Sequence, residues 1–367
     1  MNDHIRKILL PVQYGKLMLK NRIFMSTMTR LRADPKTLNA TKIMEEYYSK
    51  RSNSGLIFTE PIAVSIEGLL GVGCPGMWHD SFIEGWQRIT DKVHSKGGVI
   101  FATLSHGGRV SHYSFNGNNP PLAPSEIEED FELPITNNQI RAATTKEMSE
   151  DDIKYVFESF YQSALRVKNV GFDGICLHAS SGALVESFIK SSTNKRKDKW
   201  GKMGGLDFPL TILKIFKEVY ESDRISIKIG PVSQFNKIYD RNPIKKYTHL
   251  IEKALDIGIG MIEVKETTND IMYEEFDLKP TEQIPSCISL FSPLIRAKNN
   301  CKAIANFGTK NMEDGIYIIN SDISDFVSCG TFFINNPDLP NKILNKEEII
   351  LPERKYFYNH TPEGYIF

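Results

Sequence analysis

Short runs of consecutive apolar residues recur along the chain, and amphipathic segments lie between most of them. The eight strand candidates are Arg22–Ser26, Gly55–Pro61, Val99–His106, Gly174–Ser180, Arg224–Gly230, Met261–Glu266, Lys302–Gly308 and Asp325–Gly330. Their apolar residues are continuous rather than alternating, which is typical of strands buried on both faces. Eight such strands connected by helices predict an α/β fold, a closed (β/α)8 TIM barrel, whose functional site lies at the carboxyl ends of the strands.

Helical periodicity supports this order of elements. Between the second and third strands, apolar residues at three- and four-residue steps predict a helix over 82–96, and Gly97 and Gly98 are suited to end it. Ser149 followed by three acidic residues predicts a capped helix that runs to about Val170. Further helices are expected over 40–52, 209–220, 246–257, 288–298 and 312–319.

Two segments fall outside the repeating unit. Residues 8–22 place Gly15-Lys16 between apolar stretches, which predicts a small N-terminal hairpin across the amino end of the barrel. Residues 112–145 contain Asn-Gly, Asn-Asn and Pro-Pro pairs, which predict a long loop insertion after strand three, with or without a small hairpin. Such a loop on the catalytic side typically covers a substrate. We therefore expect one TIM-barrel domain over residues 1–367.

Charge and cysteine content narrow the function classes. The chain has 45 basic and 45 acidic residues, which argues against a general nucleic-acid or anionic-membrane surface. No apolar run approaches the roughly 20 residues of a membrane span. The five cysteines form no CxxC pair, and the N-terminus shows no secretory pattern, so we expect reduced thiols in a cytoplasmic protein. The expected partner is a small-molecule substrate, and the expected state is a monomer or homodimer.

Polar residues gather where the strand candidates end. His178 and Lys228 follow apolar residues at the ends of strands four and five, which favours side chains that point into the barrel mouth. A zinc site of His106, His178 and Glu266, or a triad that includes His178, stays open as a weaker alternative. Residues 71–76 match the GxGxxG spacing, but no strand directly precedes them, so they do not indicate a dinucleotide fold.

Further motifs extend over essentially the whole chain. They are Asn21-Arg22-Ile23, Met28-Thr29-Arg30, Tyr48, Glu60, Gly85-Trp86, residues 94–98, His106-Gly107-Gly108-Arg109-Val110-Ser111-His112, residues 171–174, residues 192–196, residues 335–339 and Phe357-Tyr358. Together they resemble the old yellow enzymes, which are FMN-containing NAD(P)H oxidoreductases of the ene-reductase class. Asn306-Phe307 and the segment that begins Gly330-Thr331 are most similar to the fungal-type branch.

The resemblance implies a role for each matching position. His178 and Ser181 match the catalytic pair that grips the carbonyl oxygen of an activated alkene, and Phe235 and Tyr358 match residues that border the substrate. Lys228 matches the cation beside the flavin N1–C2 carbonyl. The positions implied to bind FMN are Thr27, Met28, Thr29, Thr103, Lys228, Asn306, Phe307, Gly330, Thr331 and Phe357; NAD(P)H is the implied electron donor.

Several positions depart from the family pattern. The family's strand-three glutamine and tryptophan are Thr103 and Ser105, its second carbonyl donor is Ser181, and its flavin arginine is Lys228. Thr331 replaces an arginine that contacts phosphate, a charge-assisted contact worth about 1.5–3 kcal/mol. Ala183 replaces the tyrosine that protonates the substrate, and loss of a general acid slows that step by roughly 10²–10⁴-fold.

Three functions therefore remain open from the sequence. The first is an FMN ene-reductase that transfers hydride from flavin N5 to an enone-like substrate held by His178. The second is a flavoprotein with altered chemistry, such as an isomerase or a quinone reductase. The third is a barrel that has lost FMN and acts as a non-catalytic binding protein.

Overall fold

A closed barrel of eight parallel strands forms the centre of the molecule. The computed structural model describes residues 3–133, 140–266, 286–298, 300–307 and 311–366. The barrel strands are β3 (Ile23–Met25), β4 (Leu56–Ala63), β5 (Ile100–Ser105), β8 (Gly174–Ala179), β9 (Ile225–Ile229), β10 (Met261–Lys265), β11 (Lys302–Asn306) and β12 (Phe326–Cys329), in that order around the closure. All eight predicted strands are confirmed; the last residue predicted for β11, Gly308, lies outside the described residues.

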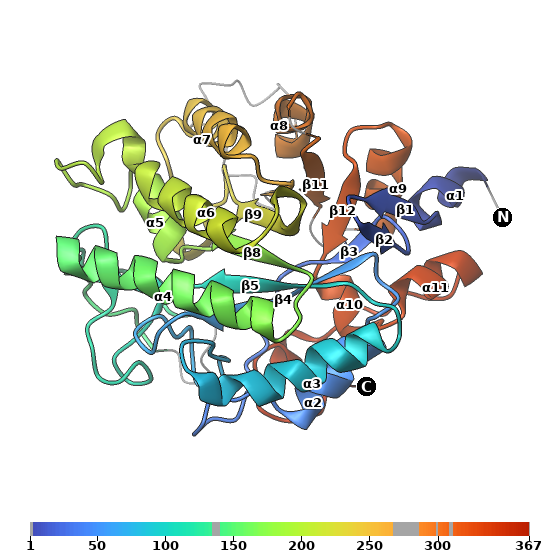
Figure 1. Ribbon diagram of the computed structural model, residues 1–367, viewed down its shortest axis with the longest axis horizontal. Coiled ribbons are helices and arrows are strands. Elements are labelled where there is room, and N and C mark those ends of the chain that lie inside the picture. Colours follow the sequence, from blue (N-terminus) through green and yellow to red (C-terminus); the bar gives the residue numbers. More distant parts are fainter. Residues whose placement is uncertain (1–2, 134–139, 267–285, 299, 308–310, 367) are drawn as a thin grey trace.

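Helices surround the barrel on its outer face (Figure 1). The predicted helices correspond to α2 (Lys42–Lys50), α3 (Ile83–His94), α4 (Glu150–Asn169), α6 (Asp207–Val219), α7 (Pro243–Ile257), α8 (Cys287–Arg296) and α9 (Met312–Asn320). The Ser149 hydroxyl accepts the N–H of Asp152 at 3.1 Å, and the Asp152 carboxylate accepts the N–H of Ser149 at 2.8 Å. This reciprocal pair is the predicted cap of α4. Four short helices were not predicted, namely α1 (Asp3–Leu9), α5 (Leu184–Ile189), α10 (Thr331–Asn335) and α11 (Leu339–Asn345).

The predicted N-terminal hairpin closes the amino end of the barrel. It consists of β1 (Val12–Tyr14) and β2 (Leu17–Leu19), which pair antiparallel. Tyr14 and Leu19 are buried in one apolar cluster with residues from inside the barrel. The Tyr14 ring meets the Phe326 ring edge-on, with centroids 6.3 Å apart. Because this end is filled, a ligand can enter only at the opposite, carboxyl end of the strands.

The long insertion after β5 is folded back against that open end. Strands β6 (Leu122–Ala123) and β7 (Lys146–Glu147) pair with each other, and an antiparallel bridge joins Glu132 to Arg141. The β6–β7 pair is parallel, so the antiparallel contact of the insertion is the bridge at Glu132, and the connecting residues 134–139 lie outside the described residues. The buried Arg109 binds Glu129 and donates to the Asn236 carbonyl at 2.9 Å, which ties the insertion to the loop after β9.

Other features limit the chemistry of the described residues. All five cysteines are buried and unpaired with one another. Among the helices that the structure describes, none combines the length and hydrophobicity of a membrane span. In the same part of the chain, no three histidine, cysteine or acidic side chains gather as metal ligands would. His106, a candidate ligand from the sequence, is buried, and its Nδ1 accepts the N–H of Gly108 at 3.1 Å.

Candidate active site

A cavity of about 400 Å³ lies at the carboxyl ends of the barrel strands. Its walls come from segments far apart in the sequence, including the loop after β3, the ends of β8 to β12 and the C-terminal segment. Twelve of the residues predicted for the site line it: Thr27, Met28, Thr29, His178, Ser181, Lys228, Phe235, Asn306, Gly330, Thr331, Phe357 and Tyr358. A cavity of this size, with mixed polar and apolar walls, suits a cofactor or small-molecule substrate.

Two predicted residues do not line the cavity. Thr103 is buried in the barrel wall, where its hydroxyl lies 2.9 Å from that of Thr27. It can therefore position Thr27, which does reach the cavity. Phe307 is buried and stacks on Phe332, with ring centroids 6.2 Å apart. Its predicted role in cofactor binding stays a prediction.

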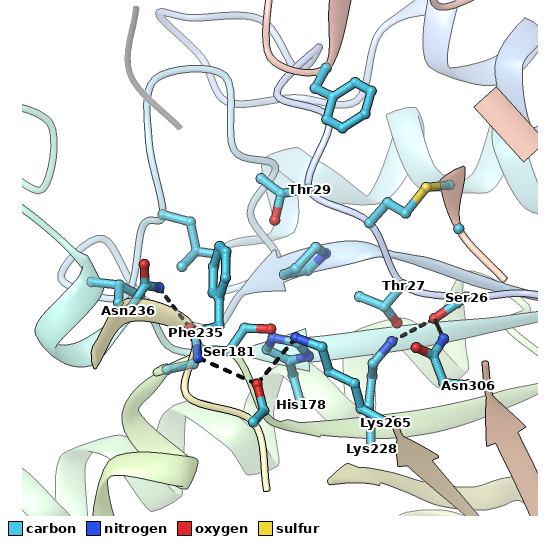
Figure 2. A pocket seen from close by; sticks show the side chains of 18 of the residues that line it. Ser26, Thr27, Thr29, His178, Ser181, Lys228, Phe235, Asn236, Lys265 and Asn306 are labelled. Carbon is cyan, nitrogen blue, oxygen red and sulfur yellow. Dashed lines mark hydrogen bonds between the residues drawn. The ribbon is translucent and has the colours of Figure 1, made fainter. Parts of the chain in front are cut away.

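A buried carboxylate that the sequence analysis missed, Glu263, organises the cavity floor. The floor consists of Ser26, Lys228, Glu263, Asn306 and Ser328. Glu263 on β10 is fully buried, and its Oε1 accepts hydrogen bonds from the hydroxyls of Ser26 at 2.7 Å and Ser328 at 2.6 Å. The same oxygen accepts from Lys228 Nζ at 3.2 Å and from Asn306 Nδ2 at 3.1 Å. Side chains from β9, β11 and β12 and from the end of β3 thus converge on one oxygen atom of Glu263 on β10. Figure 2 shows the neighbouring bonds from Lys228 and Asn306 to Ser26.

This floor determines how Lys228 faces the cavity. Its ammonium donates to Ser26 Oγ at 2.5 Å and to Glu263 Oε1, while the side chain is only 6% exposed. An ammonium group has three N–H donors, so these two bonds leave one for a ligand above the floor. Asn306, by contrast, uses its amide nitrogen within the floor, where it also bonds Ser26 and Ser328 at 3.0 Å.

His178 is a neutral hydrogen-bond donor in the cavity wall. Burial, followed by the nearby cations Lys228 and Lys265, lowers the pKa of its imidazole to about 3. The ring therefore carries a single N–H at neutral pH and can donate it to an oxygen atom. Its buried Nδ1 has no partner among the described residues.

The turn after β8 brings Ser181 beside His178. Ser181 has a φ of 64° and Gly182 a φ of 81°, so the chain reverses sharply here. The Gly182 N–H donates to Glu186 Oε2 at 2.7 Å, and Asn236 Nδ2 donates to the Ser181 carbonyl at 2.8 Å. The turn is thus fixed from both sides, and Ala183 in the same turn lines the cavity without any ionisable group.

Buried charged groups hold the two ends of the chain over the cavity. Glu60 Oε2 accepts the backbone N–H groups of Arg30 at 3.3 Å and Leu31 at 3.1 Å, and burial raises the pKa of Glu60 to about 7. The Arg30 guanidinium in turn donates to the carbonyls of Phe357 at 3.2 Å and Gly364 at 2.9 Å. This network places the Met28–Thr29 loop and the Phe357–Tyr358 segment on the same cavity.

The cavity also contains polar residues that sequence reasoning did not select, namely Ser233, Gln234, Asn236 and Lys265. Lys265 lies two residues after Glu263 in the run Met261–Glu266. Charged residues at alternate positions of an otherwise apolar strand all point to one side, which here is the barrel interior. That alternation was the available signal for both residues.

The described residues fit a flavin mononucleotide. One N–H of the Lys228 ammonium and the Thr29 hydroxyl can bond the carbonyl oxygens and ring nitrogens of a flavin. Apolar Met28 and Phe357 line the cavity beside them. At Gly330, an added Cβ would come within 2.6 Å of the Met28 side chain, so glycine leaves room for Met28 in its present position. Gly308, at the end of the preceding strand candidate, lies outside the described residues.

Comparison with known proteins agrees with this geometry. The NADH:flavin oxidoreductase / NADH oxidase family matches residues 7–348. The chain is 30% identical to a flavin oxidoreductase, hxnT, of Emericella nidulans, over 97% of this chain and 95% of that protein. It is 27% identical to a chanoclavine-I aldehyde reductase, fgaOx3, of Penicillium roqueforti, over 98% and 95%.

Solved structures give the same result. The old yellow enzyme homologue from Zymomonas mobilis superposes with a TM-score of 0.88, at 28% identity and 98% coverage of both chains. Morphinone reductase superposes with a TM-score of 0.86, at 26% identity, over 98% of this chain and 95% of that one. The protein therefore belongs to the NADH:flavin oxidoreductase / NADH oxidase family, the old yellow enzymes, and is a flavin oxidoreductase.

Proposed function

We propose that the protein is an FMN-dependent NAD(P)H oxidoreductase of the ene-reductase type, which reduces an alkene activated by a carbonyl group. The observation that carries this proposal is the placement of His178 and Ser181 on the same cavity as Lys228 and Thr29. One pair is suited to a substrate oxygen and the other to a flavin. Lys228 and Thr29 would hold FMN, which when bound would supply the chemistry of hydride transfer between NAD(P)H and the β-carbon of the alkene.

The side chains of this protein bind and polarise the substrate. The neutral His178 ring donates its N–H to the carbonyl oxygen, and the Ser181 hydroxyl donates a second hydrogen bond. Both bonds strengthen as negative charge develops on that oxygen, which is how such donors lower a barrier. Lys228 holds positive charge at the floor, where it favours an electron-rich ring system.

The proton for the α-carbon has a different source from the usual one. Ala183 lines the cavity where the family pattern has a tyrosine, and alanine carries no transferable proton. We infer that water or another hydroxyl supplies it, so turnover of simple enones is slow. This substitution also favours the second candidate function, reduction of quinones, whose oxygen atoms take protons from water without a dedicated carbon acid.

The relatives suggest the substrate class. Two of them are named as aldehyde reductases, fgaOx3 of Penicillium roqueforti and FrzD of a Cladobotryum species. An unsaturated aldehyde presents the carbonyl oxygen that His178 and Ser181 can bind. We therefore include unsaturated aldehydes with enones among the proposed substrates.

Spectroscopy tests this proposal directly. The purified protein, with and without added FMN, is expected to show flavin absorbance that NADPH bleaches. Reoxidation by 2-cyclohexenone supports the ene-reductase, whereas reoxidation by menadione alone supports the quinone reductase. A protein that shows no flavin absorbance after incubation with excess FMN and removal of the unbound FMN by gel filtration would contradict both.

A further inference from the structure

Lys265 lies at the end of β10 on the wall of the cavity, and the proposed function does not use it. Its Nζ makes one long hydrogen bond, 3.4 Å to Ser233 Oγ, and lies 5.2 Å from the ring centre of Phe235. In Figure 2 the side chain extends into the space that His178 and Ser181 also face. Lys265 is therefore placed where it can contact a substrate, whereas Lys228 belongs to the cavity floor.

The nearby carboxylates are engaged elsewhere. The two oxygens of Glu266 accept the N–H groups of Cys287 at 2.9 Å and Ile288 at 2.7 Å, at the start of α8. Glu263 serves Lys228 and the rest of the floor. In the described part of the chain, no carboxylate forms an ion pair with Lys265, in contrast to Lys228.

Glu186, the remaining acidic group near Lys265, forms no ion pair with it, although Glu186 Oε1 and Glu263 Oε2 have no hydrogen-bond partner among the described residues. Glu186 Oε2 accepts the N–H of Gly182 at 2.7 Å, and Glu186 Oε1 lies 3.8 Å from Lys190 Nζ. Lys190 and Glu186 are both fully buried and form a local pair below the turn after β8. The charge of Lys265 is thus left for the cavity.

Lys265 is partly buried. A bound anion stabilises a cation that is partly removed from water and has no ion-pair partner. Burial and the neighbouring Lys228 lower the pKa of the Lys265 ammonium to about 8. At pH 7 about 90% of the side chains still carry the charge. Glu186 and Glu263 partly offset this lowering of the pKa from a distance. The cavity therefore presents a positive charge without an ion-pair partner beside the two residues proposed to hold the substrate carbonyl, His178 and Ser181.

We propose that Lys265 binds a carboxylate of the substrate, so that the preferred substrates are α,β-unsaturated carbonyl compounds that also carry a carboxylate group. This inference rests on the proposed function, because it assigns the carbonyl oxygen to His178 and Ser181. The ammonium of Lys265 pairs with the carboxylate in a site from which water is displaced. A neutral ester of the same size forms no ion pair there.

A matched pair of substrates tests the charge. The FMN-loaded enzyme is assayed with 4-oxo-2-pentenoate and its methyl ester, which differ in charge at one end. We expect kcat/KM for the acid to exceed that for the ester by tenfold to a hundredfold, mainly through KM, as charge-assisted bonds contribute in this range. Lys265→Met should abolish the preference, and Lys265→Arg should keep most of it. Lys298→Met, at an exposed site far from the cavity, is the control.

Binding without turnover separates recognition from chemistry. Calorimetry with the saturated analogue 4-oxopentanoate, without NAD(P)H, should show affinity that falls about tenfold per pH unit above pH 8, where Lys265 loses its charge. His178 stays neutral over this range because its pKa is about 3. The other charged groups near Lys265 are Lys228, Glu263, Glu186 and Lys190. In Lys265→Met the fall above pH 8 should disappear, which assigns it to Lys265.

The outcomes distinguish this inference from the proposed function. Equal kcat/KM for acid and ester, or a preference that Lys265→Met leaves unchanged, would overturn the role of Lys265. If the enzyme still reduces 2-cyclohexenone when Lys265 proves to have no such role, the proposed function remains supported. If neither enone is reduced, the proposed function fails, and calorimetry with 4-oxopentanoate still decides whether Lys265 binds a carboxylate.

Discussion

Substitution of Glu263 by glutamine tests the organisation of the cavity floor. The change keeps the size of the side chain and removes its charge. It leaves the ammonium of Lys228 in the barrel, where Lys228 is 4% exposed and Glu263 is its ion-pair partner. The new amide nitrogen would also add a donor among the donors of Ser26, Ser328 and Asn306, which converge on Glu263 Oε1.

The expected loss follows from the burial of the pair. Removing one partner of a buried ion pair costs about 3–5 kcal/mol, because the remaining charge is uncompensated. We expect Glu263→Gln to lower the free energy of unfolding by that amount. In the double variant Lys228→Met/Glu263→Gln no charge is stranded, so its loss should be smaller than the sum of the two single losses by about 2 kcal/mol.

Urea unfolding of the FMN-free protein, followed by circular dichroism, is the appropriate assay, because bound cofactor would add its own stabilisation. The wild type, both single variants and the double variant complete one thermodynamic cycle. A loss below about 1 kcal/mol for Glu263→Gln, or strictly additive losses, would refute the idea that this carboxylate neutralises Lys228.

Four other predictions concern catalysis and folding. Ala183→Tyr should raise turnover of 2-cyclohexenone at least tenfold by restoring a proton donor. His178→Ala should lower kcat/KM about a hundredfold by removing a hydrogen-bond donor to the carbonyl oxygen. Steady-state assays check both predictions, and unchanged rates would contradict the assigned roles of these two residues. Burial lowers the pKa of His106 to about 3, whereas the unfolded chain has a histidine pKa of about 6.5. The free energy of unfolding should therefore fall as the pH drops below about 6.5, by about 2 kcal/mol at pH 5. The urea concentration at the unfolding midpoint, measured as a function of pH, should show a smaller loss of stability in His106→Gln than in the wild type. Ser149→Ala removes the cap of α4 and should cost about 1 kcal/mol in the same assay, with no change in activity.

The fold could be predicted because each barrel strand is a continuous apolar run. A strand that is buried on both faces leaves this pattern in the sequence whatever its neighbours are. Helices α5, α10 and α11 have six, five and seven residues, which is too short for a helical period to emerge. Their positions depend on tertiary contacts, such as the hydrogen bond from the Leu184 N–H, at the start of α5, to the His106 carbonyl at 3.0 Å.

The site was predicted where the strand ends themselves carry the chemistry. His178 and Lys228 lie on inward-facing strand positions, and the structure places both on the cavity. Phe307 lies just beyond a strand end, where the direction of a side chain depends on what it packs against, here Phe332. Glu263 and Lys265 were missed because their strand was considered as one apolar run, although their alternation indicates a shared inward face.

The reaction of reduced enzyme with an enone tests the central claim most directly. The FMN-loaded protein is reduced anaerobically with NADPH, mixed with 2-cyclohexenone, and followed by flavin absorbance in wild type and His178→Ala. The account predicts that absorbance returns in the wild type at a rate that depends on the enone concentration, and about a hundredfold more slowly in the variant. Absence of reoxidation by the enone in the wild type, or equal rates in both proteins, would contradict it.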